Sequence, residues 1–187
     1  MPGAKQSVAL FTLSAVLGGV VVGEVSAEPG VRASADIYSC SGGQFLGTAA
    51  MQEESTEEGV KQVRVSIHIE GISPGKHAVH IHEVAQCSPC SAAGGHFDPG
   101  PAGDSSPDGN HPYHSGDLVN IEVNRAGIGN LNVSTNRITL SQGPLSVFDA
   151  DGSAFIIHDL SDTYCPEGAE PGCAGGSRAA CGIIVLE

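Results

Sequence analysis

The sequence has few basic residues and, beyond its N-terminus, no long apolar run. Lys and Arg together number 8 in 187 residues, against 21 Asp and Glu, which gives a net charge of −13. Nucleic acids and anionic membranes bind basic patches, so this charge balance argues against both as partners. It also makes electrostatic attraction of an anionic substrate weak. Because no later apolar run can span a membrane, we expect a soluble product.

The N-terminus has the features of a secretory signal peptide. Lys5 is its one early basic charge, an apolar run covers 8–23, Glu24 closes the run, and small residues follow up to Ala27. A run of this length is short for a membrane span. We therefore expect residues 1–27 to be a signal peptide, with an uncleaved anchor as the alternative. The remaining 28–187, about 160 residues, fit one domain in the periplasm or outside the cell.

Six cysteines make disulfides possible in an exported chain. They occupy positions 40, 87, 90, 165, 173 and 181. Six cysteines can pair in fifteen ways, so their number does not choose a pattern. Cys87 and Cys90 form a C-x-x-C motif, but its redox use needs a thioredoxin-like βαβ setting, which the sequence does not show.

Helical signals are weak, and short stretches rich in β-branched residues recur between scattered Gly and Pro. Eight stretches are typical of strands: VRASADIY, FLGTAAM, KQVRVSIHIEG, HAVHIHE, LVNIEV, RITL, AFIIHD and GIIVLE. In 61–70, Val and Ile alternate with polar residues, which predicts a strand with one buried face. The pattern predicts an all-β sandwich or barrel. Two long segments, about 84–116 and 159–180, interrupt it and are expected to be functional loops.

Histidine is the residue type with the clearest pattern. His80 and His82 are two residues apart, which places both side chains on one face of a strand. Val79 and Ile81 take the opposite face and suit the core, and His77 shares that face. His68 alternates outward along its own strand, so we interpret it as solvated surface.

Further candidates for a metal site lie in the loops and at one strand end. GGHFDPG contains His96, NHPYHSGDL contains His111, His114 and Asp117, and AFIIHD ends at His158. Imidazole suits both copper and zinc, and a carboxylate beside imidazoles suits zinc.

Five motifs in order resemble those of the copper/zinc superoxide dismutases. They are GKHAVHIHE, CSAAGGHFDP, HSGDL, DGSAFIIHD and GGSRAACGII, and the likeness covers about 31–187. The resemblance implies a flattened eight-stranded Greek-key barrel with two long functional loops. It also implies an enzyme that dismutates superoxide to dioxygen and hydrogen peroxide with a redox-cycling copper, bridged to zinc through a histidine.

The resemblance further implies a role for each matched residue. The copper ligands would be His80, His82, His96 and His158. The zinc ligands would include His96, His114 and Asp117. The catalytic residues would be Arg178, which docks the anion, and His96, which carries a proton. Asp162 would link the two metal sites by hydrogen bonds, and His77 would support the ligands without binding metal. Cys90 and Cys181 would form the disulfide that ties the first loop to the last strand.

The third zinc histidine of the family is missing from its usual place after HFDP. The region reads GPAGDSSPDGN, and His111 is the only spare histidine. We expect His111 to be the third zinc histidine. Asp104 as a ligand, or a weakened zinc site in a copper-only enzyme, are the alternatives.

The remaining cysteines follow by position. Cys165 and Cys173 are eight apart in the second loop and are expected to pair locally. Pairing of Cys40 with Cys87 is then what remains.

Two other functions compete with the enzyme. A non-catalytic dismutase-like domain that binds or delivers copper would be expected to lack a copper ligand or Arg178, and neither is missing. A structural β-sandwich with incidental histidines would not explain five ordered motifs. Superoxide is the expected partner, without nucleic acid and without membrane after processing; monomer and homodimer both remain open.

The acidic second loop predicts a weak dependence of rate on salt. Residues 159–177 carry four acidic side chains and no basic one, so Arg178 has little help in attracting an anion. We expect kcat/KM for superoxide to stay below that of the fastest family members and to change modestly between about 0.01 and 0.3 M ionic strength. A steep fall in kcat/KM over this range would contradict the prediction.

Overall fold

The computed structural model describes residues 30–100 and 103–187, which form an antiparallel β-barrel with one short 3-10 helix, η1. The expected signal peptide, 1–27, lies outside the described residues. The elements are β1 (Arg32–Ser39), β2 (Phe45–Ser55), β3 (Lys61–Glu70), β4 (Gly75–His77), β5 (Val79–His82), η1 (Cys90–Ala93), β6 (Ile121–Val123), β7 (Ile128–Thr135), β8 (Ala154–His158), β9 (Arg178–Ile183) and β10 (Val185–Leu186). The all-β class is confirmed.

The sheet nearly closes on itself through one stretch of chain. β4 and β5 are separated only by Ala78, yet they lie at opposite ends of the strand order β4-β6-β7-β3-β2-β1-β9-β8-β5, while β10 pairs with β1. Closure leaves few free edges on which another chain could add. The interruptions at Ala78 and Ile184 each divide one expected strand, which is part of why ten segments replace the eight expected.

Two of the strand predictions need correction. The RITL stretch, 137–140, is not a strand, although Ile138 and Leu140 are buried in the core. The backbone amides of Leu140 and Ser141 donate to the carboxylate of Glu53 instead of to a neighbouring strand. The sequence does not predict β7, because its Gly and Asn residues are rare in strands. The structure nevertheless pairs β7 with β3 along its whole length.

The alternation predicted for 61–70 is confirmed in β3. Val63, Val65, Ile67 and Ile69 are buried in the main core, whereas most of the residues between them are exposed. Each such side chain contributes roughly 1.5–3 kcal/mol to stability when fully buried. This core fixes the strands from which the functional histidines project.

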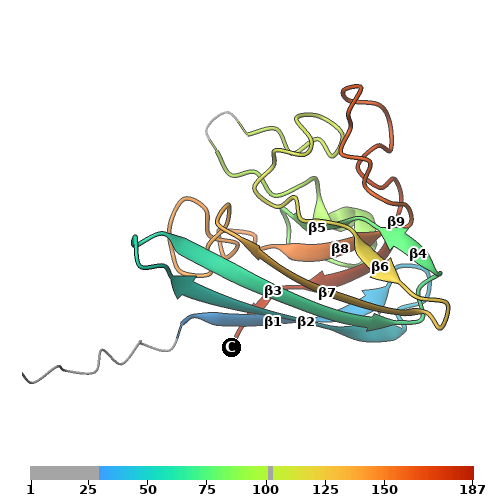
Figure 1. Cartoon of the computed structure of the whole chain (residues 1–187), viewed down its shortest axis with the longest axis horizontal. Helices are drawn as coiled ribbons and strands as arrows, with labels where there is room; N and C mark the ends of the chain where they lie inside the picture. The colour runs from blue at the N-terminus through green and yellow to red at the C-terminus, as the bar shows by residue number, and fades with distance from the viewer. Residues whose placement is uncertain (1–29, 101–102) are drawn as a thin grey trace, which may run out of the picture.

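The two long loops lie on the same side of the barrel. Figure 1 shows them above the strands, the first in yellow-green and the second in red. Asp108 of the first loop accepts hydrogen bonds from the amides of Gly172 and Ala174 in the second, at 2.9 and 3.1 Å. The loops therefore support each other over the ends of β5 and β8.

The disulfides correct two of the expected pairs. The structure joins Cys40 to Cys90 and Cys87 to Cys181, so the expected Cys90–Cys181 and Cys40–Cys87 pairs are wrong. The Cys181 sulfur lies 3.8 Å from the carbonyl oxygen of Gln86, which places it beside Cys87 rather than Cys90. The three-residue spacing of Cys87 and Cys90 brings both near β9, so chain position could not separate them. Cys165 and Cys173 are joined locally, as expected.

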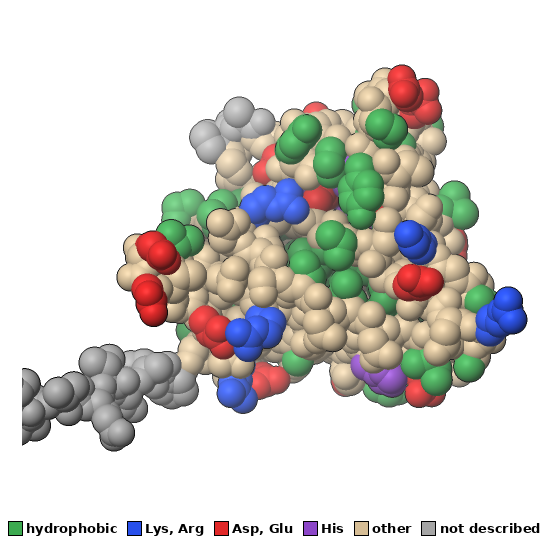
Figure 2. All heavy atoms as spheres, in the orientation of Figure 1, with side chains coloured by type: hydrophobic (Ala, Val, Ile, Leu, Met, Phe, Trp, Pro, Cys, Tyr) green, Lys and Arg blue, Asp and Glu red, His purple; other side chains and the backbone are tan. Residues whose placement is uncertain are grey.

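The outer face carries mixed charges. Figure 2 shows Lys and Arg side chains scattered singly, with acidic side chains between them, over the face that it draws. Among the described residues, no helix has the length and hydropathy needed to cross a membrane.

The revised disulfides predict unequal contributions to stability. Cys87 and Cys181 are 94 residues apart, whereas Cys165 and Cys173 are 8 apart. The chain-entropy relation gives about 4–5 kcal/mol for the longer loop and about 2–3 kcal/mol for the shorter. We expect the double variant Cys87→Ser/Cys181→Ser to lose more free energy of unfolding in urea than Cys165→Ser/Cys173→Ser. Peptide mapping without reduction that links Cys90 to Cys181 would contradict the assignment.

Candidate metal centre

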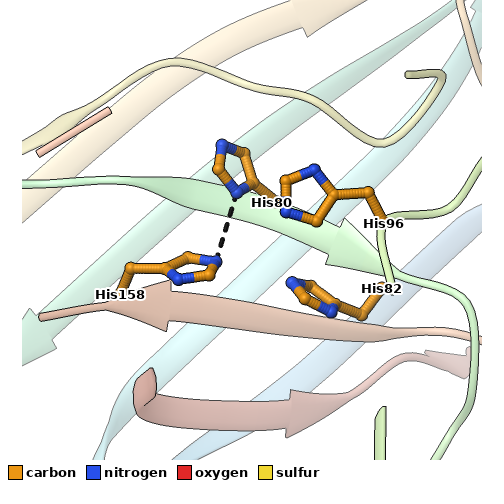
Figure 3. A group of neighbouring side chains, drawn as sticks. All are labelled: His80, His82, His96 and His158. Carbon is orange, nitrogen blue, oxygen red and sulfur yellow. Dashed lines mark hydrogen bonds between the residues drawn. The ribbon is translucent and has the colours of Figure 1, made fainter. Parts of the chain in front are cut away.

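Four histidines converge at the end of β5 and β8, beneath the long loops. His80 and His82 lie on β5, His158 ends β8, and His96 comes from the first loop. One ring nitrogen of each lies within 4.8 Å of those of the other three, and all four side chains are buried (Figure 3). β5 and β8 are paired, and the register shift between Ile157 and His158 falls where His158 joins the group. Val79 and Ile81 fill the core on the opposite face, as predicted.

The hydrogen bonds of these rings fix which nitrogen is free. His82 donates from Nδ1 to the carbonyl of Gly94 at 3.0 Å, and His158 donates from Nδ1 to the carbonyl of Gly176 at 2.9 Å. A carbonyl only accepts, so each ring keeps its lone pair on Nε2. His80 uses Nε2 for Asp162, at 3.1 Å, and keeps its lone pair on Nδ1.

The free nitrogens point toward one another. His80 Nδ1 and His158 Nε2 are 3.2 Å apart (dashed line, Figure 3). The Nε2 atoms of His82 and His96 are buried and have no hydrogen-bond partner among the described residues. Facing lone pairs in a buried space repel unless a cation lies between them. The donor set is four imidazole nitrogens, which fits copper.

A second group surrounds the carboxylate of Asp117. Its oxygens lie 2.7 Å from Nδ1 of His96, 3.0 Å from Nδ1 of His111 and 2.9 Å from Nδ1 of His114. All four side chains are buried. Three imidazoles and one carboxylate form a donor set that fits zinc, because a divalent cation replaces the protons that hold such contacts together.

His96 belongs to both groups. Its Nδ1 contacts Asp117, and its ring centroid lies 4.2 Å from that of His80 and 4.9 Å from that of His82. Asp162 connects the groups by a second route, since its carboxylate accepts from Nε2 of His80 and, at 2.8 Å, from Nε2 of His111.

The structure also places the remaining predicted residues. Asp104 is exposed, and its carboxylate accepts from the amide of Ser106, so it does not join the Asp117 group. His77 points away from both groups and contacts the carbonyls of His158 and Ser73, each at 2.8 Å.

Arg178 begins β9 directly opposite His158. Its guanidinium donates to the carbonyl of Cys90 at 2.7 Å and to the carbonyl of Gly94, the same oxygen that receives His82. The arginine is half-buried, so its charge is held beside the four-histidine group.

Comparison with known proteins agrees with this arrangement. The model of the family described as "Copper/zinc superoxide dismutase (SODC)" matches residues 45–184. The chain belongs to the copper/zinc superoxide dismutase family. The enzyme class expected from the sequence is thereby confirmed at the level of the family.

Two curated relatives are similar over most of the chain. A protein from Deinococcus radiodurans named "Superoxide dismutase [Cu-Zn]" is 38% identical in an alignment of length 135 that covers 65% of this chain and 69% of that protein. A Drosophila melanogaster protein named "Extracellular superoxide dismutase [Cu-Zn]" is 34% identical in an alignment of length 132 that covers 68% of this chain and 70% of that protein.

Solved structures of a SOD-like protein from Bacillus subtilis share the fold. One has a TM-score of 0.65 and 26% identity, and covers 81% of this chain and 97% of its own. A double mutant of that protein, in which a tyrosine and a proline are replaced by histidines, has a TM-score of 0.62 and 31% identity. The match covers 80% of this chain and 95% of the mutant chain.

Sequence reasoning missed two residues of this family member's site. The side-chain amide of Asn120 binds the backbone of Asp162, donating to its carbonyl at 3.0 Å and accepting from its amide at 2.7 Å. Asp108 joins the two loops by hydrogen bonds. At Gly175 the second loop lies so close to the segment between β4 and β5 that an added Cβ would be 2.5 Å from the Cβ of Ala78. A lone polar residue outside a motif carries no signal of this kind in a single sequence.

Burial and hydrogen bonding shift the site's titrations in opposite directions. Burial lowers the pKa of His80 to about 3 and that of His158 to about 4. Burial also opposes protonation of His111, but hydrogen bonds to Asp117 and Asp162 outweigh it and raise the pKa of His111 to about 9. Burial raises the pKa values of both carboxylates, but hydrogen bonds outweigh it and hold them well below their usual range. His111, His114 and His96 have this effect on Asp117, and His111 and His80 have it on Asp162. The four-histidine group is therefore neutral at neutral pH, as metal ligands must be.

These shifts predict how the metal-free protein responds to acid. The pKa of His158 is near 6.5 when unfolded and about 4 when folded, so the unfolded state binds the proton first. Stability is then lost as pH falls from about 6.5 to 4, with up to about 1.4 kcal/mol per pH unit from one such group. We expect His158→Gln to flatten the dependence of the free energy of unfolding on pH in this window, measured in urea after chelation.

The exposed His68 supplies a matched control for that measurement. His68→Gln removes an imidazole that is not buried, so the steep acid slope should persist in this variant. Equal slopes in His158→Gln and the wild type would contradict the assignment.

Proposed function

We propose that this chain is an exported enzyme that dismutates superoxide to dioxygen and hydrogen peroxide. Copper would be held by His80, His82, His96 and His158, and zinc by His96, His111, His114 and Asp117. Family membership supports the reaction. The arrangement of donor nitrogens supports the two sites.

The position of His96 carries the proposal. One ring reaches two donor groups of different chemistry, with Nδ1 in the carboxylate-containing group and Nε2 in the all-imidazole group. A core histidine with only a structural role would have hydrogen-bond partners for its polar atoms instead. If metal ions were bound in both groups, His96 would serve as a ligand to each, which would account for an Nε2 that is buried and unpartnered among the described residues.

The residues around the bridge would bind the anion and move the proton. A bound copper ion supplies a one-electron redox couple. Arg178 would dock superoxide by charge-assisted hydrogen bonds, because its guanidinium is anchored on two carbonyls beside the four-histidine group. His96 would take a proton at Nε2 and pass it to the reduced anion, as one of the two protons that hydrogen peroxide needs, the other coming from solvent, while its Nδ1 stays held on the Asp117 side. Burial of the imidazoles keeps bulk water from the ligands.

His111 is the proposed third zinc histidine. Its Nδ1 lies 3.0 Å from Asp117, and its Nε2 donates to Asp162, which leaves Nδ1 available as a ligand. Asp104 lies exposed elsewhere in the loop. These contacts favour a complete zinc site over a copper-only enzyme.

A non-catalytic copper-binding or copper-delivery domain is the alternative. The solved neighbours are called SOD-like rather than superoxide dismutases. This chain, however, has four convergent histidines and the anchored Arg178, so it lacks neither of the features that such a domain would be expected to lose.

Export and the absence of macromolecular ligands are part of the proposal. Three disulfides fit an oxidising compartment, the periplasm or the extracellular space, and one relative is named an extracellular enzyme. The net charge of −13 argues against nucleic acid and anionic membrane as partners, and superoxide as the partner is supported by family membership. A monomer and a homodimer are equally compatible with the site.

Metal content and activity test the proposal together. We expect the purified mature protein to hold one copper and one zinc per chain and to dismutate superoxide. His111→Ala should lose zinc and keep copper, because His111 belongs only to the Asp117 group. His68→Ala, on the exposed strand surface, should leave both metals unchanged.

These measurements distinguish the enzyme from the copper-binding alternative and test His111 as a zinc ligand. A copper-loaded wild type without dismutase activity would establish the copper-binding alternative. Unchanged zinc in His111→Ala would remove His111 from the site.

A further inference from the structure

We infer that Arg137 is a positioning residue of the zinc-side group, which holds the segment 111–117 in place from the sheet. The inference rests on the proposed zinc site. It concerns a residue outside every motif that carried the family resemblance.

Two hydrogen bonds of one guanidinium carry the inference. Arg137 lies two residues beyond the end of β7, and its Nη1 donates to the carbonyl of Pro112 at 3.1 Å. Its Nη2 donates to the carbonyl of Asp117. One acceptor thus follows His111 directly, and the other belongs to Asp117 itself. The guanidinium spans the segment from one end to the other.

This segment is unusually dense in ligands. Within seven residues it supplies His111, His114 and Asp117, three of the four donors around the proposed zinc. Among the described residues its one internal backbone bond runs from the amide of Asp117 to the carbonyl of His114, at 3.2 Å. Outside the segment, Gly116 donates to the carbonyl of Phe97 at 2.8 Å and accepts from the amide of Ile81 at 2.9 Å. A ligand segment without regular secondary structure needs support from outside.

The planar guanidinium is suited to that support. Its N–H groups form a rigid fork, so binding two carbonyls fixes their separation and direction together. The backbone of Arg137 is also held, because its amide donates to Thr135 Oγ1 at 3.2 Å in the turn after β7. Arg137 is half-buried, and its guanidinium meets main-chain oxygens rather than the Asp117 carboxylate. It therefore positions the ligands without competing for them.

Several parts of the fold hold the segment: Gly116 bonds to the backbones of Ile81 and Phe97, and two side chains from other elements bind the rest. Asp162 of the second loop binds the side chain of His111, and Arg137 of the sheet binds the backbone on both sides of His114. Asp162 also touches the copper side through His80, whereas Arg137 has no contact there among the described residues. The inference predicts a selective effect on zinc.

The test is the zinc affinity of Arg137→Lys in the full chain, measured by competition with a chromophoric chelator. Lysine keeps the charge but loses the fork. Removing groups that orient metal ligands typically costs 10–100-fold in affinity, and we expect a loss in that range. Copper affinity should not change. The visible spectrum of cobalt(II) placed in the zinc-side group should shift, since it reports ligand geometry directly.

Arg125→Lys is the matched control. Arg125 lies exposed in the turn between β6 and β7 and makes no side-chain hydrogen bond among the described residues. This variant should bind zinc as the wild type does. Arg137→Gln, which loses the charge as well, should bind zinc at least as weakly as Arg137→Lys. Thermal unfolding of the metal-free variants separates a loss of zinc binding from a loss of fold.

Three results would overturn the inference. They are equal zinc affinities in Arg137→Lys and Arg125→Lys, an unchanged cobalt spectrum in Arg137→Lys, or a matching loss of copper and zinc with lower stability of the metal-free protein. In each case a wild type that holds copper and zinc and is active leaves the proposed function standing. A wild type that binds no zinc would instead refute the zinc site itself.

Discussion

The carboxylate of Asp162 is the contact on which the rest of the site depends. It accepts one hydrogen bond from His80 on the barrel and one from His111 in the first loop, and it belongs to the second loop. Barrel and loops therefore meet at one buried group. Because each imidazole donates from Nε2, the Nδ1 atoms of both rings are left free for a metal. A buried carboxylate is costly unless its oxygens are satisfied, so this arrangement specifies the position of all three partners at once.

The same logic extends through the centre. Every ring that would bind copper from a strand has its second nitrogen on a fixed acceptor: Gly94, Gly176 or Asp162. Two of these acceptors are backbone carbonyls of the long loops. The loops thus do more than cover the strands, because their conformation decides which nitrogen of each histidine faces inward. The disulfides and the Asp108 contacts stabilise that conformation without touching the donors.

Much of this could be predicted from residue type and spacing. Strand parity alone placed Val79 and Ile81 in the core and grouped His80 with His82, because side-chain direction in a strand depends only on position. The all-β class followed from the density of turn residues and β-branched stretches. Most candidate ligands lie in ordered motifs, and His111 was chosen as the spare histidine; the structure brings them together in two groups.

The predictions that failed depend on contacts between segments far apart in the sequence. Cys87 and Cys90 are equivalent in sequence, and only the position of Cys181 beside Gln86 distinguishes them. The RITL stretch has a strand composition, but the side chain of Glu53 takes the place of a neighbouring strand. β7 has a poor strand composition and is held by its full pairing with β3. Asn120 and Arg137 act on backbone groups, which no residue pattern reveals.

Barrel closure and site assembly depend on the same stretch of chain. The stretch that reaches both ends of the strand order, β4 through β5, is also the one that carries His80 and His82. Its contacts are with segments far away in sequence, which makes such pairing slow to form. β5 pairs with β8, which sets His80 and His82 beside His158, while β4, one residue before it, pairs with β6 and closes the barrel. Metal captured by the native state therefore stabilises the closed barrel as a whole, by mass action, and not the loops alone.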